Sequence, residues 1–369
     1  MSEVKRIEIQ DLNLWDHKKK QFRALYSFDL ELTARCNLNC RHCYINLPAN
    51  DKKAKEKELT LQEIEEISDQ AIDLGAVWVL LSGGEPLLRK DFVDIYLMLK
   101  HKGLLVSVFT NATMIKPEHV KLFTRFPPRD IEVTIYGSQK EIYERVTRKN
   151  GSFSSFLQGL NLLFEAGVRI RLKAMAMRSN IEDLDAITEF GQKYTKDFYR
   201  FDPVLHLRYD HDKIRNDEIR SERLSPKDII GLEMGDKRRF DSLKRNCDEL
   251  IIETFKFRQD DHLFHCGAGN GNFSIGYDGT FKLCSSLSAP GTTVNLREVS
   301  LRKAWQEFVP QVRNLRIKDS DYLRRCAKCS IMNLCLNCPA HAFLETGKMD
   351  SVVPYFCDVA FARAEALKN

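Results

Sequence analysis

Short apolar runs rich in Val, Ile, Leu and Phe alternate with amphipathic stretches along the first two thirds of the chain. These runs predict six β-strands: Phe28–Thr33, Val77–Ser82, Leu104–Phe109, Ile131–Tyr136, Arg169–Met177 and one near Phe201–Leu207. Runs that are mostly apolar are typical of parallel strands covered on both faces, because a half-exposed strand would alternate apolar and polar positions.

Helical patterns separate the runs. The clearest begins at Thr60, which forms a capping box with Glu63, and ends at Gly75. The pattern predicts further helices at Lys90–Lys102, Pro117–Phe123, Ser154–Ala166 and Ile181–Lys193. This βα alternation predicts right-handed crossovers and a parallel sheet, either open or curled into a barrel, with ligands at the carboxyl ends of the strands.

The pattern changes in the last third. Periodicity fades over Tyr209–Arg223, which we interpret as a solvated connector, and Tyr277–Thr280 reads as a hairpin turn. We expect an N-terminal extension over 1–25, an α/β unit over 26–243, a linker over 244–261, and a Cys-rich domain with a C-terminal helix over 262–369. His206, on the last predicted strand, is expected to be a surface or core residue.

Composition narrows the function classes. The 57 basic and 52 acidic residues leave a net charge of +5, which gives no argument for a nucleic-acid partner. No apolar run approaches the roughly 18–20 residues of a membrane span. The N-terminus lacks the apolar core of a signal peptide, so we expect a cytoplasmic protein without a membrane partner.

Cysteine is unusually frequent, with eleven residues of which ten fall in two groups. An odd number in a chain without a signal peptide argues against a disulfide framework. Directly after the first strand, Cys36, Cys40 and Cys43 form a CxxxCxxC triplet. Three thiolates can hold three irons of a [4Fe–4S] cluster and leave the fourth iron open for catalysis. The alternative is a zinc knuckle in which His42 is the fourth ligand.

The triplet resembles the signature of the radical SAM superfamily, with His42 at its usually aromatic position. Ser82, Gly83, Gly84 and Glu85, followed by a proline, resemble the family's GGE segment, which binds the amino group of S-adenosylmethionine. The chemistry agrees, because glycines allow close backbone approach and a carboxylate accepts hydrogen bonds from an ammonium.

Two further strand ends resemble the family. Asn111 follows Thr110 where a polar pair usually faces the pocket, and Thr134 matches a hydroxyl that contacts the ribose. Tyr136 stands where that segment usually has Asp.

The partner of the methionine carboxylate is less clear from the motif. The family often has an Arg at the position of Thr147, which here lies between Arg145 and Arg148. Lys173 on the fifth strand is a further candidate.

The distal cysteines resemble the SPASM domain of peptide-modifying radical SAM enzymes. The resemblance implies a partial (β/α)6 TIM-type barrel followed by a small Cys-rich iron–sulfur domain. It also implies two auxiliary [4Fe–4S] clusters besides the radical SAM cluster. One would be held by Cys326, Cys329, Cys335 and Cys357, and the other by Cys266, Cys284 and Cys338.

The match has two departures. Two residues rather than three precede Cys338, and Asn272 stands where fully ligated relatives have another Cys. The second auxiliary cluster would then have an open iron or take an outside ligand. Cys247 is interpreted as a buried structural thiol, that missing ligand or a hydrogen-atom donor. Paired zinc sites are the alternative for the whole group.

The resemblance implies an enzyme that generates a 5′-deoxyadenosyl radical and abstracts hydrogen from a peptide or peptide-derived substrate, in an oxidative maturation such as crosslinking. A flavodoxin or ferredoxin-type protein would supply electrons. Ser285 replaces the Asp base of sulfatase maturases, which counts against that activity. The first strand begins so early that leader recognition is expected to use a separate protein or the barrel itself.

Three alternatives remain open: a peptide epimerase or redox-neutral modifier of a non-peptide metabolite, a non-catalytic iron–sulfur electron carrier, and a zinc-binding interaction module. The GGE segment and the polar strand ends argue against a carrier, which has no use for an amino-acid pocket.

Overall fold

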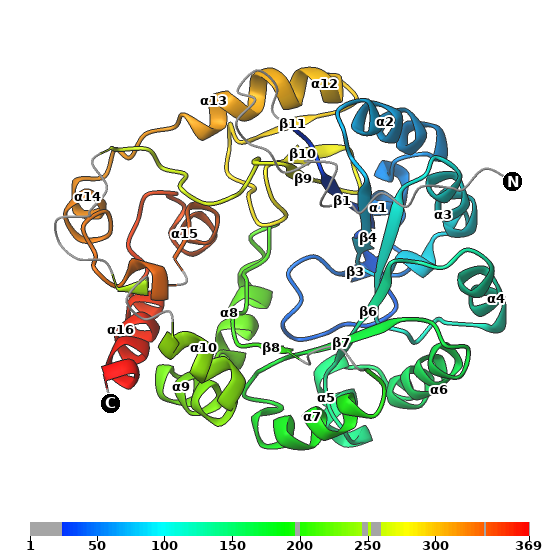
Figure 1. Cartoon of the computed structure of the whole chain (residues 1–369), viewed down its shortest axis with the longest axis horizontal. Coiled ribbons are helices and arrows are strands. Elements are labelled where there is room, and N and C mark those ends of the chain that lie inside the picture. Colours follow the sequence, from blue (N-terminus) through cyan, green and yellow to red (C-terminus); the bar gives the residue numbers. More distant parts are fainter. Residues whose placement is uncertain (1–23, 196–199, 246–249, 252–259, 336, 369) are drawn as a thin grey trace, which may run out of the picture.

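The computed structural model describes residues 24–195, 200–245, 250–251, 260–335 and 337–368 (Figure 1). Its centre is a parallel sheet of six strands in sequence order, which confirms the predicted partial (β/α)6 barrel. They are β1 (Ser27–Thr33), β4 (Trp78–Gly83), β5 (Leu105–Thr110), β6 (Asp130–Ile135), β7 (Ile170–Met175) and β8 (Arg200–Asp202). All six predicted strands are present, and the last is shorter than expected.

Helices cover the outer face of this sheet (Figure 1). The predicted ones are α2 (Leu61–Asp73), α3 (Phe92–His101), α4 (Pro117–Arg125), α6 (Ser152–Glu165) and α7 (Leu184–Gln192), the last preceded by the 3₁₀ turn η3 (Ile181–Asp183). The capping box is confirmed, because Thr60 and Glu63 exchange hydrogen bonds of 2.7 and 3.2 Å between side chain and backbone. Not predicted were α1 (Lys52–Lys57), the 3₁₀ turn η2 (Pro86–Leu88) and α5 (Lys140–Thr147).

The interpretation of Tyr209–Arg223 as a solvated connector is wrong. This segment contains α8 (Lys213–Glu222), and α9 (Pro226–Gly235) and α10 (Lys237–Arg245) follow it. Few apolar residues mark α8, but Asp212 caps its first turn by accepting a hydrogen bond from the Arg215 N–H at 3.1 Å. Ile219 is fully buried, and Glu218 pairs at 2.7 Å with Arg148, the residue directly after α5. Caps and ion pairs therefore support a helix that the hydrophobic pattern does not reveal.

The C-terminal region continues the barrel sheet. Strand β9 (Asn272–Ile275) pairs in parallel with β1, and β10 (Thr280–Lys282) and β11 (Thr293–Asn295) extend the sheet in antiparallel fashion. The predicted hairpin turn lies between β9 and β10. The rings of Phe28 and Phe273 stack at 5.7 Å across the β1–β9 pair. Strands from both sides of the linker expected over 244–261 therefore share one sheet. Much of that linker lies outside the described residues.

The remaining C-terminal elements are mostly helical. They are α12 (Leu301–Lys303), the π-turn η5 (Ala304–Phe308), α13 (Val309–Arg313), α14 (Ser320–Arg325), the 3₁₀ turn η6 (Met332–Leu334), α15 (Pro339–Thr346) and α16 (Pro354–Lys368). A buried ion pair at 2.6 Å between Arg363 and Glu233 joins α16 to α9. None of the helices in the described part of the chain has the length and apolar character of a membrane span.

Candidate active site

The cysteine loop lies at the carboxyl end of β1 and is closed by a short parallel pair. Strands β2 (Arg35–Cys36) and β3 (Leu47–Pro48) bring the two ends of the loop together. The N–H groups of Asn39 and Arg41 donate to the last carbonyls of α5 at 3.0 and 3.1 Å. The loop is therefore anchored on both sides, as a site with fixed ligand positions requires.

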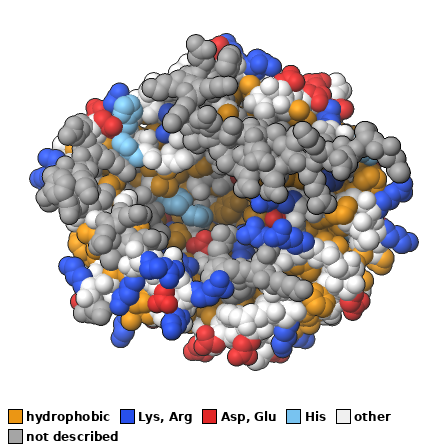
Figure 2. Space-filling view, in the orientation of Figure 1, with side chains coloured by type: hydrophobic (Ala, Val, Ile, Leu, Met, Phe, Trp, Pro, Cys, Tyr) orange, Lys and Arg blue, Asp and Glu red, His pale blue; other side chains and the backbone are white. Residues whose placement is uncertain are grey.

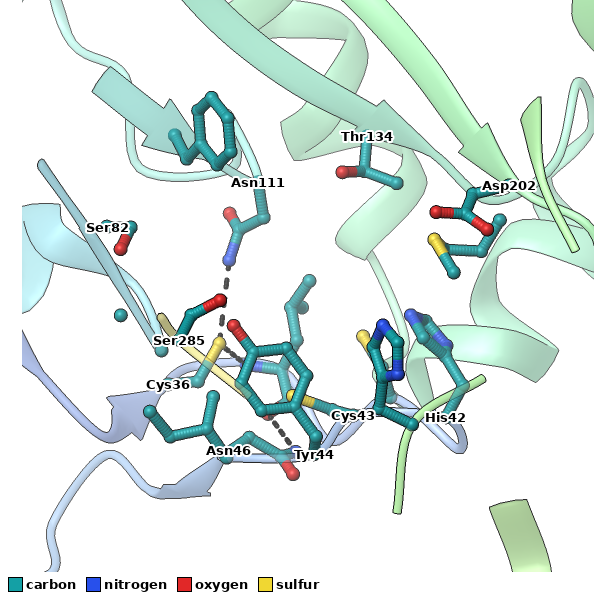
Figure 3. Close-up of a pocket in the computed structure, with 18 of the residues that line it drawn as sticks. Cys36, His42, Cys43, Tyr44, Asn46, Ser82, Asn111, Thr134, Asp202 and Ser285 are labelled. Carbon is teal, nitrogen blue, oxygen red and sulfur yellow. Dashed lines mark hydrogen bonds between the residues drawn. The ribbon is translucent and has the colours of Figure 1, made fainter. Parts of the chain in front are cut away.

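The triplet cysteines line a cavity of about 310 Å³ (Figure 3). Burial, with the nearby Glu85 charge, raises the pKa of Cys36 to about 12, and burial also raises the pKa of Cys40 well above its ordinary value. Figure 2 shows that this face of the molecule is hollowed near its centre, where His, acidic and basic side chains meet. The sequence-predicted residues that also line the cavity are His42, Ser82, Gly83, Gly84, Asn111, Thr134 and Lys173.

The glycine segment fits closely against β1. A Cβ on Gly84 would lie 2.3 Å from the Arg35 carbonyl oxygen, and one on Gly83 would lie 2.2 Å from that of Thr33. Gly83 also has a φ of +131°, which favours glycine. These two residues are therefore required by the backbone packing, whatever ligand the segment binds.

Glu85 does not line the cavity, contrary to its expected contact with an ammonium group. Its carboxylate is fully buried and accepts hydrogen bonds from the Leu87 N–H at 3.1 Å, the Thr110 hydroxyl at 2.8 Å and the Asn111 N–H at 2.8 Å. Burial raises its pKa from 4.5 to about 7. The side chain thus ties the glycine segment to the end of β5.

The strand-end residues face the cysteine loop. The Asn111 amide donates to Asn37 at 3.0 Å and points at the Cys36 sulfur at 3.7 Å (Figure 3). Lys173 forms an ion pair with Glu132, and its ammonium lies 4.4 Å from the centre of the Phe109 ring. Arg145 and Arg148, the other candidates for the methionine carboxylate, bond to Ser179 and Glu218 and are not among the residues that line the cavity.

His42 lies beside Tyr136, with ring centres 5.2 Å apart. Burial and the charge of Arg215 lower the pKa of His42 to about 4, so the imidazole is neutral near pH 7. Its buried Nδ1 has no hydrogen-bond partner among the described residues.

The cavity is also closed by residues to which the sequence assigned no role there, among them His206, which was expected to be a surface or core residue. Asp202 is the last residue of β8 and His206 follows that strand, and burial lowers the pKa of His206 to about 4. His206 also stacks on His341 at 4.1 Å. The Tyr209 ring meets that of Tyr44 at 5.1 Å, and its hydroxyl donates to the Ser285 carbonyl. The sequence gives little indication of a role for these residues, because Tyr44 alone among them adjoins a recognised motif.

A second group of thiols lies in the Cys-rich region. The four cysteines expected to share one auxiliary cluster, Cys326, Cys329, Cys335 and Cys357, all line a separate cavity of about 290 Å³. Burial and the neighbouring thiols raise the pKa of Cys326 to about 12. The structure therefore brings this predicted set together.

The other predicted set is less enclosed. Cys338 is the N-cap of α15, where its sulfur accepts a hydrogen bond from the His341 N–H at 3.4 Å, and Cys266 is exposed. Burial raises the pKa of Cys338 to about 11, with smaller contributions from Cys284 and Cys266. Cys247 lies outside the described residues.

Among the described residues, no three Cys, His, Asp or Glu side chains converge as a single metal ion requires. In an iron–sulfur cluster each thiolate can bind its own iron, so a wider arrangement suffices.

The chain has recognisable relatives. The sequence profile of the Radical SAM superfamily matches residues 30–191. The AdoMet-dependent heme synthase of Methanosarcina barkeri is 27% identical over 88% of this chain and 94% of its own length. The mycofactocin maturase MftC of Mycolicibacterium smegmatis is 29% identical over 44% of this chain and 41% of its own.

Among solved structures, Streptococcus suis SuiB bound to its precursor peptide SuiA superposes with a TM-score of 0.65. The match has 18% identity and covers 89% of this chain and 74% of SuiB. This likeness establishes the fold.

Proposed function

Because the chain belongs to the radical SAM superfamily, we propose that it is an oxidative enzyme that removes a hydrogen atom from a peptide or peptide-derived substrate. The superfamily uses S-adenosylmethionine and a [4Fe–4S] cluster, and the Cys-rich C-terminal region fits auxiliary clusters. One observation carries the oxidative assignment: Ser285 and Ser286 line the same cavity as the cysteine triplet. The segment that begins with Cys284 therefore borders the place where substrate would react.

The residues present fit these cofactors. The cavity offers three thiols on one anchored loop, and the backbone of Gly83 and Gly84 lines its wall. Cys36, Cys40 and Cys43 would hold the cluster, and Gly83, Gly84, Asn111, Thr134 and Lys173 would hold S-adenosylmethionine. When bound, these groups supply a carbon radical that removes a hydrogen atom from the substrate.

The chain's own groups exclude water and handle the proton. Tyr44, Tyr136 and Phe109 line the cavity with aromatic rings, which shield a reactive site from solvent. After hydrogen removal, an oxidative reaction also releases one electron and one proton. The cysteines of the Cys-rich region would hold an auxiliary cluster that could take up the electron, and Asp202, whose carboxylate lines the cavity, would accept the proton (Figure 3).

A tetrapyrrole substrate is the second candidate, favoured by the nearly full-length similarity to a heme synthase. The lining of the cavity argues against it. Among the described residues that line the cavity, Lys173 is the one Lys or Arg side chain, and it is already paired with Glu132. Several propionate groups would need more cations than that.

The test uses the anaerobically reconstituted full chain with dithionite and S-adenosylmethionine. Formation of 5′-deoxyadenosine is measured with no addition, with a pooled synthetic peptide library and with Fe-coproporphyrin III. Stimulation by peptides, with modified peptides detected by mass spectrometry, is expected. Stimulation by the porphyrin alone would reverse the ranking of the two substrates. Absence of 5′-deoxyadenosine from protein that carries its full iron would refute the catalytic assignment.

A further inference from the structure

Arg208 holds the cysteine loop from the side of the segment that follows β8. Its Nη1 donates to the carbonyl oxygens of Cys43 at 3.3 Å and Asn46 at 3.2 Å, and to the Asn46 side chain at 3.0 Å. The side chain is 4% exposed, and Asp210 pairs with its other nitrogens at 2.5 to 3.2 Å. Because Asp210 neutralises it in bidentate fashion, Arg208 adds many hydrogen bonds to the loop but little net charge.

Arg215 of α8 contacts the same loop, but its charge is less fully neutralised than that of Arg208. Its Nη2 donates to the Cys40 carbonyl at 2.8 Å, and its Nη1 donates to the Asn39 side chain at 3.0 Å. Glu218 lies 3.4 Å from Arg215 but 2.7 Å from Arg148. Two guanidinium groups thus share this carboxylate, which leaves an excess of positive charge behind the loop.

We propose that Arg208 positions the cysteine loop, and that Arg215 raises the reduction potential of the cluster the loop holds. The inference rests on the assignment of the cluster to Cys36, Cys40 and Cys43. Reduction adds one negative charge to a cluster, so a nearby fixed cation stabilises the reduced form. Net charge, hydrogen bonding and solvent exposure are the means by which proteins set such potentials. A guanidinium stays charged at all working pH values, so this effect is permanent.

The two arginines contact different parts of the loop. Arg208 contacts the carbonyl of the last cysteine of the triplet, whereas Arg215 contacts that of the middle one. Both also reach Asn46, near the end of the loop. The side of the loop away from the substrate is therefore fixed by side chains, while the cavity side remains free for ligands.

The test is a redox titration followed by electron paramagnetic resonance. The signal that changes when S-adenosylmethionine is added identifies the cluster of the triplet. Arg215→Gln is expected to shift its reduction equilibrium about tenfold toward the oxidised form, which equals about 59 mV for one electron. Arg215→Lys keeps the charge and is expected to stay near the wild-type potential. Lys213→Gln, at the exposed start of the same helix, is the matched control and is expected to change nothing.

Glu218→Gln gives a test of opposite sign. It removes the shared carboxylate, so the potential is expected to rise, while the hydrogen bonds of Arg215 to the Cys40 carbonyl and the Asn39 side chain do not involve Glu218. Arg208→Gln is expected to lower the iron content of the reconstituted protein, because it removes the contacts that fix Cys43.

Several outcomes would overturn the inference. An unchanged potential in a fully loaded Arg215→Gln variant would remove the electrostatic role, as would equal shifts in the Gln and Lys variants. A Glu218→Gln potential at or below that of the wild type would do the same. Wild-type iron content in Arg208→Gln would remove its positioning role. If S-adenosylmethionine alters no signal in the wild type, the cluster assignment beneath the proposal fails.

Discussion

Replacing Glu85 by Gln tests the cost of burying a carboxyl group between β4 and β5. The wild-type side chain is fully buried and accepts hydrogen bonds from Leu87, Thr110 and Asn111. Those bonds favour the charged form, but burial outweighs them and raises the pKa from 4.5 to about 7. Gln has nearly the same shape and cannot ionise.

The sign follows from proton linkage. Between pH 4.5 and about 7 the folded protein keeps a proton on Glu85 that the unfolded chain releases. The contribution of Glu85 to the free energy of unfolding therefore falls as pH rises from 4.5 to about 7, and it stays constant at higher pH. Each pKa unit is worth about 1.4 kcal/mol, so the full effect is about 3 kcal/mol.

The assay is urea denaturation of the reduced, cluster-free proteins, followed by circular dichroism. Gln offers no acceptor to the Asn111 N–H, which costs about 1–3 kcal/mol at every pH. The informative quantity is therefore how the difference in the free energy of unfolding between the two proteins changes with pH. From about pH 5 to about pH 8, this difference is expected to change by about 2–3 kcal/mol in favour of the Gln variant. Glu141→Gln, an exposed control, is expected to show no such change. A difference that is the same at both pH values would refute the reasoning.

Three further predictions follow from other parts of the molecule. Gly84→Ala places a methyl group 2.3 Å from a backbone carbonyl oxygen and is expected to weaken S-adenosylmethionine binding at least about tenfold by equilibrium dialysis. Gly231→Ala, with no neighbour within 4 Å, is its control, and equal affinities would contradict the prediction. Arg363→Met removes the ion pair with the buried Glu233 and is expected to lower the free energy of unfolding, measured by urea denaturation, by about 3 kcal/mol. A decrease below about 1 kcal/mol would show that the pair contributes little to stability. Cys326→Ser is expected to lower the reconstituted iron content by up to about four atoms per chain, and an unchanged iron count would exclude this auxiliary site.

The barrel could be predicted because its signals are local. Buried residues such as Val79, Val106 and Val133 stand in short apolar runs that identify their strands without knowledge of the partner strand. Helix α8 could not be predicted, because its stability depends on Arg148 and on a side-chain cap rather than on an apolar face. The pairing of β9 with β1 was equally hidden, since a parallel edge contact leaves no mark in a four-residue strand.

The candidate site divides in the same way. Cys36, Cys40 and Cys43 could be predicted because a loop motif fixes its ligands by spacing alone. Arg208 and Arg215 could not, because their contacts with the loop form only after more than 160 residues have folded back. The sequence places Glu85 in the segment that follows β4, as the structure does. Its side chain is directed toward the end of β5 instead of into the cavity, and the local sequence does not determine this direction.

The pairing of β1 with β9 has a consequence for synthesis of the chain. Ser27 pairs with Asn272, so the ribosome must add about 245 residues before one edge of β1 can be covered. At roughly 5–20 residues per second this edge stays open for about 12–50 seconds. An open strand edge is a template for association with other chains. The Cys-rich segment therefore protects the nascent barrel, and a chain that stops before β9 is expected to aggregate even though all six barrel strands are present.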